Sequence, residues 1–430
     1  MKRKKIGIIG GGASGLMAAV AAAENLSGYQ NEDIIIFEKK DRIGKKILAT
    51  GNGKCNVTNL EFSIQEPDLF YRGGKPEQLS EIFSCFSEKD TIRKFEQMGV
   101  LLMSRNGYIY PLSQQASTIL DAFRFELDRL GVCVETECAI SEIRRKKSGF
   151  ELYSDKGSWF VDRLILACGT PAGEKQGEGL DGYRMAASLG HTVQGPWPAL
   201  VQLRCEGNFW KGLAGVRTDA DICLIVGGKK GEKRWCERGE LQLTDYGISG
   251  IPVFQLSRYA SMGLDRGAKV RAVIDFMPEI KDWKGFVQNR IKNFYGRSME
   301  VLFGGLVNKK IIQVLLKLCG LKLQDLLDHS SEKRAGDVFS LLKSFEVIIC
   351  AANPFSSAQV CAGGIPLREV SVRMESLRME GMYLSGELLD VDGRCGGYNL
   401  QWAWSSGYLA GRDAARSLNG NNRAEREKMK

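Results

Sequence analysis

The sequence predicts an α/β fold in which a parallel sheet is interrupted by an inserted domain. Three observations support this prediction. Residues 5–24 have the pattern of a buried strand, a glycine turn and a helix, and a second apolar strand follows at 33–37. From about residue 193 the pattern changes to short strands followed by helices. A strand, turn and helix followed by another buried strand is the usual start of a doubly wound sheet.

The turn after the first strand has the spacing Gly10-x-Gly12-x-x-Gly15. In a dinucleotide fold the first glycine makes the tight turn, the second lets a pyrophosphate approach the backbone, and the third lets the helix pack closely. The helix N-terminus, with Ala13 and Ser14, then offers free N–H groups and a positive dipole end. The motif alone is weak evidence for a nucleotide site, because a purely structural turn can have the same spacing. The strand before it and the helix-forming residues after it favour a nucleotide site.

Glu38 ends the second predicted strand, 23 positions after Gly15. An acid at this place can accept hydrogen bonds from both hydroxyls of an adenosine ribose. The alternative is a surface acid without a ligand.

The loop that follows, residues 39–59, is rich in Gly, Asn, Thr and Lys, and it has few large apolar residues after Leu48. Such a loop can wrap a polar ligand with its backbone N–H groups, while lysines neutralise phosphate or the charge of a reduced flavin. The alternative is an ordinary surface loop. The candidate ligand-binding residues here are Lys39, Gly44, Lys45, Lys46, Thr50, Gly51, Asn52, Gly53, Cys55 and Asn56.

The first domain is predicted to extend to residue 192. A buried strand over 162–169 ends in the small residues Cys168 and Gly169, and a strand end of this kind often passes under a cofactor. The other expected elements are helices over 76–98 and 113–130, a hairpin at 100–110, a strand at 132–134 and a three-stranded meander over 138–161.

Residues 193–345 are predicted to form the inserted domain, first β and then helical, and Pro196-Trp197-Pro198 marks its start. The chain is then expected to return to the first domain over 346–418, beginning with a strand at 347–350, and to end in a disordered tail, 419–430. The elements expected in the insert are strands over 200–205, 221–226, 240–244 and 269–275 and helices near 281–294, 297–304, 308–318 and 322–328.

A second helix N-terminus suited to a ligand is predicted near residue 400. The last predicted strand ends in Gly386 and Glu387, and Gly396 and Gly397 stand just before the helix. Such an N-terminus can bind a phosphate or a carbonyl oxygen. The alternative is a plain helix start with a permissive Gly-Gly turn.

The composition of the chain limits the classes of function that the sequence predicts. The chain has 430 residues and a net charge of +9, but Lys and Arg are scattered among Asp and Glu, so nucleic-acid binding is not predicted. Twelve cysteines without a secretory signal favour a reducing cytosol over a disulfide framework. No apolar run is long enough to span a membrane. There is no CxxC pair, and the two histidines, His191 and His329, suggest neither a metal site nor a catalytic triad.

Four segments together resemble the bacterial family of BaiN-type, aminoacetone oxidase-like NAD(P)/FAD-dependent oxidoreductases. They are residues 10–16, 38–59, 167–169 and 383–407, of which 51–59 and 386–401 are the most specific. Shorter similar stretches at 106–113, 243–252 and 362–364 extend the resemblance over nearly the whole chain. The resemblance implies a glutathione-reductase-like Rossmann FAD-binding domain, with an inserted β-barrel-like and small helical domain.

The resemblance also implies an FAD site. Glu38 would hold the adenosine ribose, the turn from Gly10 to Gly15 the pyrophosphate, and the helix N-terminus near residue 397 the O2 edge of the flavin ring, where it stabilises the anionic reduced form. The remaining positions implied are Gly386, Glu387, Gly396, Gly397, Tyr398 and Asn399, with the backbone near Ala139 at the adenine.

The activity implied is that of a cytoplasmic FAD-dependent oxidoreductase. It would reduce an activated C=C bond in a small organic substrate such as a steroid or bile-acid-like enone, with NAD(P)H as a transient reductant. Tyr246 and Tyr398 are candidate proton donors. Cys55 has no cysteine five positions later, and Cys133 and Cys138 have the pattern of core packing, which argues against disulfide reduction. The alternatives are an amine oxidase, an RNA-modifying flavoprotein and a non-catalytic flavin-binding protein; the oligomeric state stays open.

Overall fold

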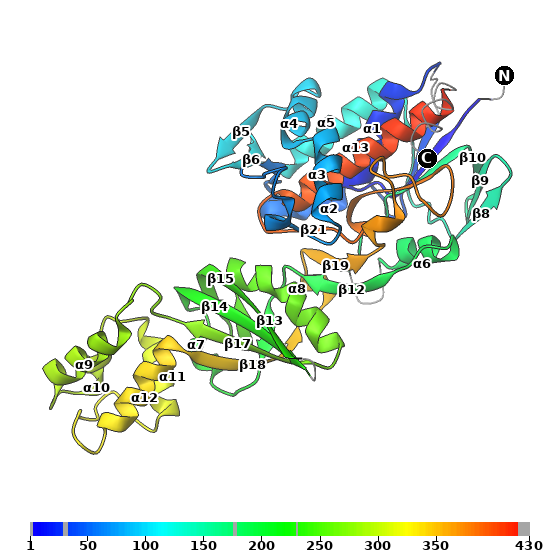
Figure 1. Ribbon diagram of the computed structural model, residues 1–430. Coiled ribbons are helices and arrows are strands. Elements are labelled where there is room, and N and C mark those ends of the chain that lie inside the picture. Colours follow the sequence, from blue (N-terminus) through cyan, green and yellow to red (C-terminus); the bar gives the residue numbers. More distant parts are fainter. Residues whose placement is uncertain (1–2, 29–32, 175–178, 229–230, 420–430) are drawn as a thin grey trace. The chain divides into compact units, whose positions relative to one another are not determined.

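The computed structural model describes residues 3–28, 33–174, 179–228 and 231–419. The chain divides into two compact units, residues 1–196 with 360–430, and residues 197–359, each with its own apolar core (Figure 1). Apart from Asn419, the predicted disordered tail lies outside the described residues.

The first unit is built on a parallel sheet of order β20-β11-β1-β2-β7. β1 is buried along its whole length between β2 and β11, as expected for a central strand covered on both faces. The glycine turn after β1 therefore lies at the carboxyl edge of the sheet, where doubly wound proteins bind their ligands. The strands are β1 (Ile6–Ile9), β2 (Ile34–Phe37), β7 (Cys133–Glu135), β11 (Arg163–Leu166) and β20 (Met382–Leu384).

Two long helices, α1 (Ala13–Asn25) and α13 (Tyr398–Leu418), lie side by side in this unit (Figure 1). Their contact runs from backbone to backbone: a Cβ on Gly407 would come within 2.3 Å of the Ser14 carbonyl oxygen, and one on Gly411 within 2.0 Å of the Ala18 carbonyl oxygen. Small residues on both helices thus set how closely the C-terminal helix approaches the glycine turn.

The predicted meander packs against the sheet, because a Cβ on Gly7 in β1 would lie 3.0 Å from a methyl group of Val161.

The predicted helix over 76–98 is instead two helices. Ser87 accepts from the Asp90 backbone N–H and Asp90 accepts from the Ser87 N–H, a capping box that starts a new helix. The other elements of the unit are α2 (Lys45–Ala49), β3 (Thr58–Asn59), β4 (Tyr71–Arg72), α3 (Pro76–Cys85), α4 (Glu88–Gln97), β5 (Leu102–Arg105), β6 (Tyr108–Pro111), α5 (Ala116–Leu130), β8 (Glu142–Lys146), β9 (Gly149–Ser154), β10 (Gly157–Val161), α6 (Asp181–Ser188), β19 (Val360–Gly364) and β21 (Asp392–Gly393), with β12 (Gln194–Ala199) crossing the unit boundary.

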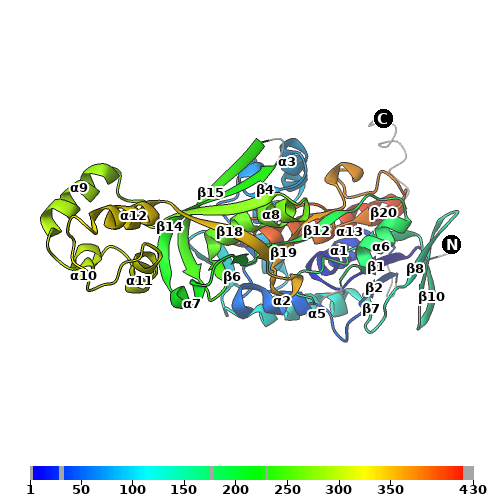
Figure 2. The same ribbon diagram turned by 90° about the horizontal axis from the view of Figure 1, so that it is seen from below.

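The second unit is a closed barrel of order β13-β16-β15-β14-β17-β18, joined to a cluster of the helices α9 to α12 (Figure 2). The strand predicted to return the chain to the first domain is a wall of this barrel, since it pairs with β13 and β17. The first unit therefore resumes at residue 360 and not at 346. The elements are β13 (Leu203–Cys205), α7 (Trp210–Leu213), β14 (Arg217–Gly228), β15 (Gly231–Leu243), β16 (Gly247–Ser249), α8 (Ile251–Asp265), β17 (Lys269–Asp275), α9 (Trp283–Phe294), α10 (Met299–Phe303), α11 (Lys309–Leu318), α12 (Glu332–Lys343) and β18 (Phe345–Ala352).

The helix predicted near 322–328 is wrong. The segment instead forms a turn and an isolated β-bridge between Leu326 and Ser298. The carbonyl oxygens of Leu323 and Asp325 accept from the first backbone N–H groups of α10, and the Leu327 N–H donates to the Arg297 carbonyl oxygen. Such tertiary hydrogen bonds override local helix propensity. The sequence prediction also missed α8 and α12, although Pro252 in the first turn of α8 is a common helix-start signal.

His191 has a structural role. It is buried after α6, where Nδ1 lies 2.8 Å from the Glu369 carboxylate and Nε2 lies 2.8 Å from the Ser376 hydroxyl. Burial alone would raise the pKa of Glu369, but hydrogen bonds from Thr192, His191 and Arg378 outweigh it and hold the pKa at about 2.

This carboxylate predicts an acid-sensitive contribution to stability. Because its folded pKa lies below the ordinary value of 4.5, Glu369 stabilises the fold above that pH and loses this effect as pH falls towards about 2. Glu369→Gln should lower the free energy of unfolding by ~1–3 kcal/mol at neutral pH, and the difference from the wild type should shrink below pH ~4.5. Urea unfolding at both pH values tests this, and a difference independent of pH would contradict it.

Candidate functional site

The glycine turn between β1 and α1 contains glycines that the packing requires and one that it does not. Gly10 has a φ of 110°, and a Cβ there would lie 2.4 Å from the Ala167 carbonyl oxygen; a Cβ on Gly15 would lie 1.9 Å from the Gly10 carbonyl oxygen. Gly12, the N-cap of α1, has an extended backbone, and a Cβ there would meet nothing within 4 Å. The fold itself therefore requires Gly10 and Gly15, while Gly12 leaves open space at the helix N-terminus.

This N-terminus has no side-chain cap and no acidic residue in its first turn. Its first N–H groups, at Ala13 and Ser14, have no partner within the helix, and they carry the positive end of the helix dipole. The open space at Gly12 is thus bordered by donors suited to an anion.

Glu38 is fixed beside this turn. One carboxylate oxygen accepts from the Gly11 N–H at 2.7 Å and the other from the Lys40 N–H at 2.8 Å. Each oxygen keeps a second lone pair for a ligand hydroxyl. The Cys138 N–H donates to the Glu38 carbonyl oxygen, so the exposed Ala139 lies one residue from this contact.

The loop after Glu38 forms a short helix, α2, followed by an irregular turn. Gly44 enters α2 with a φ of 70°, and a Cβ there would lie 2.3 Å from Leu120. Gly51, Asn52 and Cys55 all have positive φ values, and the Thr50 hydroxyl donates to the Ile47 carbonyl oxygen. A Cβ on Gly53 would meet nothing within 4 Å.

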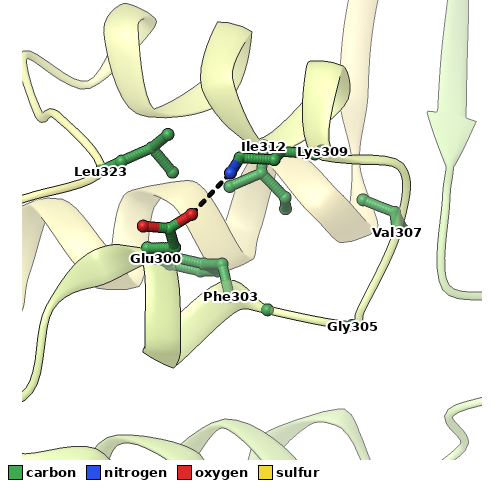
Figure 3. Close-up of a pocket in the computed structure, with 8 residues that line it drawn as sticks. Glu300, Phe303, Gly305, Val307, Lys309, Ile312 and Leu323 are labelled. Carbon is green, nitrogen blue, oxygen red and sulfur yellow. Dashed lines mark hydrogen bonds and ion pairs between the residues drawn. The ribbon is translucent and has the colours of Figure 1, made fainter.

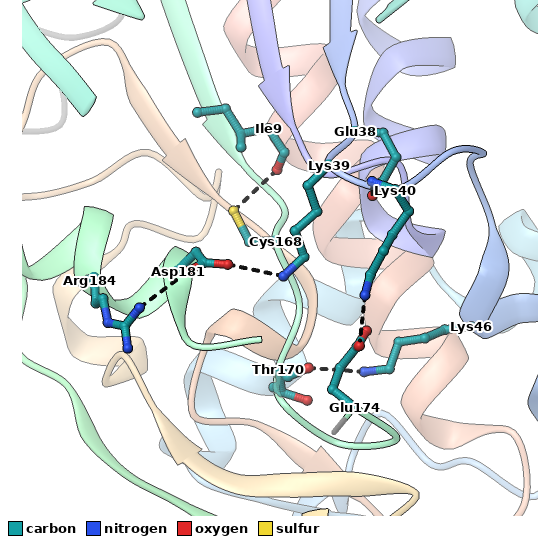
Figure 4. Close-up of polar contacts among 10 residues, drawn as sticks. All are labelled: Ile9, Glu38, Lys39, Lys40, Lys46, Cys168, Thr170, Glu174, Asp181 and Arg184. Carbon is teal, nitrogen blue, oxygen red and sulfur yellow. Dashed lines mark hydrogen bonds and ion pairs between the residues drawn. The ribbon is translucent and has the colours of Figure 1, made fainter. Parts of the chain in front are cut away.

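The lysines of this loop make ion pairs with acids of the same unit (Figure 4). Lys39 lies 3.0 Å from Asp181 and Lys40 lies 3.0 Å from Glu174. Lys46 reaches the Thr170 carbonyl oxygen, and it lies 3.3 Å from the Glu387 carboxylate. The fourth pair joins Lys45 and Asp41. These partly exposed pairs each contribute little to stability, so the lysines stay available to a phosphate.

Cys55, Cys168 and Cys361 lie in the predicted cofactor-binding segments or beside them, and all three are thiols. Burial raises the pKa of Cys55, Cys168 and Cys361 to about 12. The Cys168 thiol lies 3.4 Å from the Ile9 carbonyl oxygen (Figure 4). These groups stay protonated at neutral pH, so they surround the site as neutral side chains.

The turn at Gly386 meets the N-terminus of α1. Gly386 has a φ of 71°, and a Cβ there would lie 2.4 Å from the Ser14 hydroxyl oxygen. The Gly386 N–H donates to the Ser406 hydroxyl at 2.9 Å, and its carbonyl oxygen accepts from the Trp402 indole at 2.9 Å. Sequence reasoning missed Trp402 as a positioning residue, since an aromatic residue in a helix ordinarily indicates only core packing.

The N-terminus of α13 is held against the loop from α2. Gly397 has a φ of 95°, and a Cβ there would lie 2.9 Å from both the Asn56 side-chain oxygen and the Thr58 carbonyl oxygen. The Asn59 amide donates to the Gly396 carbonyl oxygen at 3.0 Å, and the Tyr71 hydroxyl donates to the Tyr398 carbonyl oxygen at 2.9 Å. The glycine pair is therefore required by the chain's own packing, whether or not a ligand binds.

Asn399 does not point its side chain freely into the site. Its oxygen accepts from the Gly393 N–H at 2.8 Å, and its nitrogen donates to the Gly393 carbonyl oxygen at 3.0 Å. Any contact of Asn399 with a ligand would thus come from its backbone N–H.

The arrangement fits an FAD. Within the described residues, the Asn56 side-chain oxygen and the Ser385 hydroxyl are buried without a hydrogen-bond partner, and both lie in predicted cofactor segments. Buried polar atoms normally find a partner, which the hydroxyls or ring nitrogens of a flavin nucleotide can supply. The open space at Gly12, the free lone pairs of Glu38 and the two helix N-termini complete the donor and acceptor set.

The two candidate proton donors belong to different units. Tyr398 starts α13, and burial raises its pKa to about 12, so its hydroxyl stays protonated. Tyr246 lies in the second unit, where its hydroxyl accepts from the Asn353 amide at 3.0 Å and the Arg204 guanidinium lies 4.8 Å from the ring centre.

The helical cluster of the second unit contains a separate small cavity of about 140 Å³ (Figure 3). Lys309 and Glu300 form an ion pair of 2.5 Å beside it. Sites for drug-sized ligands measure about 300–1,000 Å³, so this cavity is too small for a flavin. The lining residues are Glu300, Phe303, Gly304, Gly305, Val307, Lys309, Ile312 and Leu323.

A Rossmann sheet with a ligand-ready glycine turn, an acid after its second strand and a C-terminal helix that packs on the first helix is the framework of an FAD-dependent oxidoreductase. The chain belongs to the HI0933-like family, since the profile described as "HI0933-like protein Rossmann domain" matches residues 4–413. When bound, the flavin supplies hydride chemistry, while the protein supplies binding, orientation and electrostatics.

Characterised relatives cover nearly the whole chain. A 3-dehydro-bile acid delta(4,6)-reductase from Clostridium scindens is 41% identical over 415 residues, which are 96% of this chain and 99% of the relative. A ribosomal RNA dihydrouridine synthase from Haemophilus influenzae is 27% identical over 93% of this chain and 96% of its own. A 3-ketosteroid delta1-dehydrogenase structure from Sterolibacterium denitrificans shares the fold, with a TM-score of 0.51 at 12% identity and coverages of 96% and 99%.

The described part of the chain holds neither a metal-binding cluster nor a membrane-spanning helix. No group of His, Cys, Asp and Glu in the described part of the chain is arranged to hold a metal ion. Within those ranges, no helix has both the length and the apolar character that crossing a membrane requires.

Glu38 gives a direct test of the adenosine side of the site. Glu38→Ala should weaken FAD ~10- to 100-fold, because one charge-assisted hydrogen bond is worth ~1.5–3 kcal/mol. FMN, which has no adenosine, should bind equally well to both proteins. Fluorescence titration of the apoproteins measures this, with Glu174→Ala as a nearby acidic control. Equal losses of FAD and FMN affinity would remove Glu38 from the adenosine site.

Proposed function

We propose that the protein reduces a carbon–carbon double bond conjugated with a carbonyl group in a small organic substrate, with NAD(P)H as the reductant. The observation that supports this most strongly is the 41% identity, along almost all of both chains, to a 3-dehydro-bile acid delta(4,6)-reductase. A steroid or bile-acid-like enone is accordingly the first substrate class to test.

The relatives that act on RNA are compatible with the same chemistry. Dihydrouridine is uridine whose C5–C6 double bond, conjugated with a carbonyl, has been saturated. Reduction of a conjugated double bond is thus common to the activities of both relatives. We favour a small molecule over RNA because the identity is higher to the bile-acid reductase and because basic residues are scattered along the chain. The many free thiols of the described residues support a cytoplasmic location.

The flavin-site residues have three roles in this proposal. The α1 N-terminus and Glu38 bind the pyrophosphate and the ribose, and the α13 N-terminus stabilises negative charge at the O2 edge of the ring. Tyr398 or Tyr246 supplies a proton to the substrate carbon. NAD(P)H binds transiently, since the sequence contains a single glycine-rich turn of the dinucleotide type.

A substrate panel tests the proposal. The purified protein, supplied with FAD and either NADH or NADPH, is incubated anaerobically with a steroid 4-en-3-one, an unmodified ribosomal RNA transcript or aminoacetone, and the products are analysed by mass spectrometry. The proposal predicts that the enone gains two hydrogens and the RNA none. Dihydrouridine in the RNA would favour the alternative substrate, and oxidation of the amine in a parallel aerobic reaction would favour an oxidase.

A further inference from the structure

Two cysteines face each other on the wall of the barrel. The antiparallel register of β14 and β15 places Cys223 opposite Cys236, with Cα atoms 4.1 Å apart, and the two are joined as a disulfide. This pair is a correction to the sequence prediction, which expected reduced cysteines without a disulfide framework. The other cysteines of the described residues are free.

The pair faces solvent and not the core. Cys236 is exposed and Cys223 is partly buried, whereas their neighbours Ile222 and Leu224 point inwards and belong to the core of the unit. Side chains alternate along a strand, so Arg234 and Arg238 lie on the same outer face as Cys236. A small molecule in solution can therefore reach the sulfur of Cys236.

The hairpin does not need the crosslink to form. β14 and β15 pair in unbroken register from Arg217 opposite Gln242 to Gly228 opposite Gly231. On the outer face, Arg238 pairs with Asp221 at 2.7 Å, two register positions from the cysteines. The barrel closes through strand pairing and a buried core, and both are independent of the redox state of the cysteines.

We propose that Cys223 and Cys236 form a reversible thiol–disulfide site that reacts with low-molecular-weight disulfides of the glutathione type. This inference does not depend on the proposed reductase activity. It accounts for the free state of the other cysteines and for the crosslink between these two. Under reducing conditions the two residues are thiols like the others, and under oxidising conditions their register lets them form the disulfide.

The reaction balances without a further reagent. The Cys236 thiolate attacks one sulfur of the small disulfide, forms a mixed disulfide and releases one small thiolate. The Cys223 thiolate then attacks the Cys236 sulfur, closes the protein disulfide and releases the second small thiolate. Two electrons pass from the protein thiols to the small disulfide, and the two protons end on the released thiols.

The charged neighbours favour the first step at Cys236. Arg234 lies two residues before Cys236 on the same face, while Arg238, two residues after it, is paired with Asp221 and Glu279. Arg234 is therefore the cation that favours the thiolate of Cys236. Cationic side chains near a cysteine stabilise the thiolate, which is the attacking species. They also attract glutathione disulfide, whose carboxylates give it a net negative charge. Cys223 has no arginine at the corresponding positions of β14, where Asp221 and Ile225 stand.

The experiment uses the full-length protein in glutathione buffers of varied thiol-to-disulfide ratio. After acid quenching and alkylation, peptide mass spectrometry measures the state of each cysteine. We expect Cys223 and Cys236 to lose alkylation together and to regain it when the ratio is reversed, while the exposed Cys85 and Cys350 form no protein disulfide. The proposal is overturned if the pair stays alkylated at every ratio, or if it stays oxidised in excess thiol under native conditions.

Single variants test the order of attack. In Cys223→Ser, glutathione disulfide should form a stable mixed disulfide at Cys236, about 10-fold faster than at Cys223 in Cys236→Ser. Equal rates or the reverse order would contradict the assignment of Cys236 as the attacking residue.

Discussion

Replacing Gly12 with valine should weaken FAD binding strongly and leave the fold intact. A Cβ at this position meets nothing within 4 Å, and its backbone has the extended conformation that any residue can adopt. In the FAD complex the same space would hold the pyrophosphate, so the side chain would push the phosphates away from the helix N-terminus. We expect a loss of ~100-fold or more in FAD affinity, equivalent to ~2.8 kcal/mol.

Equilibrium dialysis of the apoprotein with FAD measures the affinity, and circular dichroism verifies the fold. Gly12→Ala is the matched intermediate, with a smaller loss because its side chain is a single methyl group. An unchanged FAD affinity in Gly12→Val would show that the pyrophosphate does not lie at this turn.

The second large effect is on stability and concerns Gly411. A Cβ there would lie 2.0 Å from the Ala18 carbonyl oxygen, so α1 and α13 must separate to admit even a methyl group. We expect Gly411→Ala to destabilise the first unit by ~3 kcal/mol, which corresponds to roughly 5–10 °C in Tm.

Gly336, inside α12, supplies a control of opposite sign. A Cβ there meets nothing within 4 Å, so Gly336→Ala should stabilise its helix by up to ~1 kcal/mol through helix propensity. Differential scanning calorimetry of both variants tests the contrast. If Gly411→Ala melts at or above the wild-type temperature, the close contact between the two helices is not present.

Much of the first unit could be predicted because its signals are local. The apolar run of β1, the glycine spacing after it and the strand that ends at Glu38 are each short, and their type of structure is confirmed. Local patterns do not reveal strand partners, however. The segment at 347–350 was correctly predicted as a strand but assigned to the wrong unit, since only its pairing with β13 and β17 places it in the barrel.

In the candidate site, too, local patterns could be predicted from the sequence and three-dimensional contacts could not. The sequence indicated which glycines mark the turn, but only the three-dimensional contacts distinguish Gly12, which the fold does not need, from Gly10 and Gly15, which it does. The ion pairs of Lys39 and Lys40 join residues far apart in the sequence, and no periodic pattern encodes them. The crosslink between Cys223 and Cys236 spans only 13 residues, but it depends on the register of β14 and β15. The roles of the cofactor-binding residues stay predictions.

A single-turnover experiment tests the central claim most directly. The FAD-loaded protein is reduced anaerobically with one equivalent of NADPH and then mixed with a steroid 4-en-3-one, while flavin absorbance is followed by stopped flow. The account predicts that the oxidised spectrum returns and that one equivalent of saturated ketone forms per flavin. A flavin that remains reduced with the enone, but returns to the oxidised spectrum when oxygen alone is admitted, would contradict it.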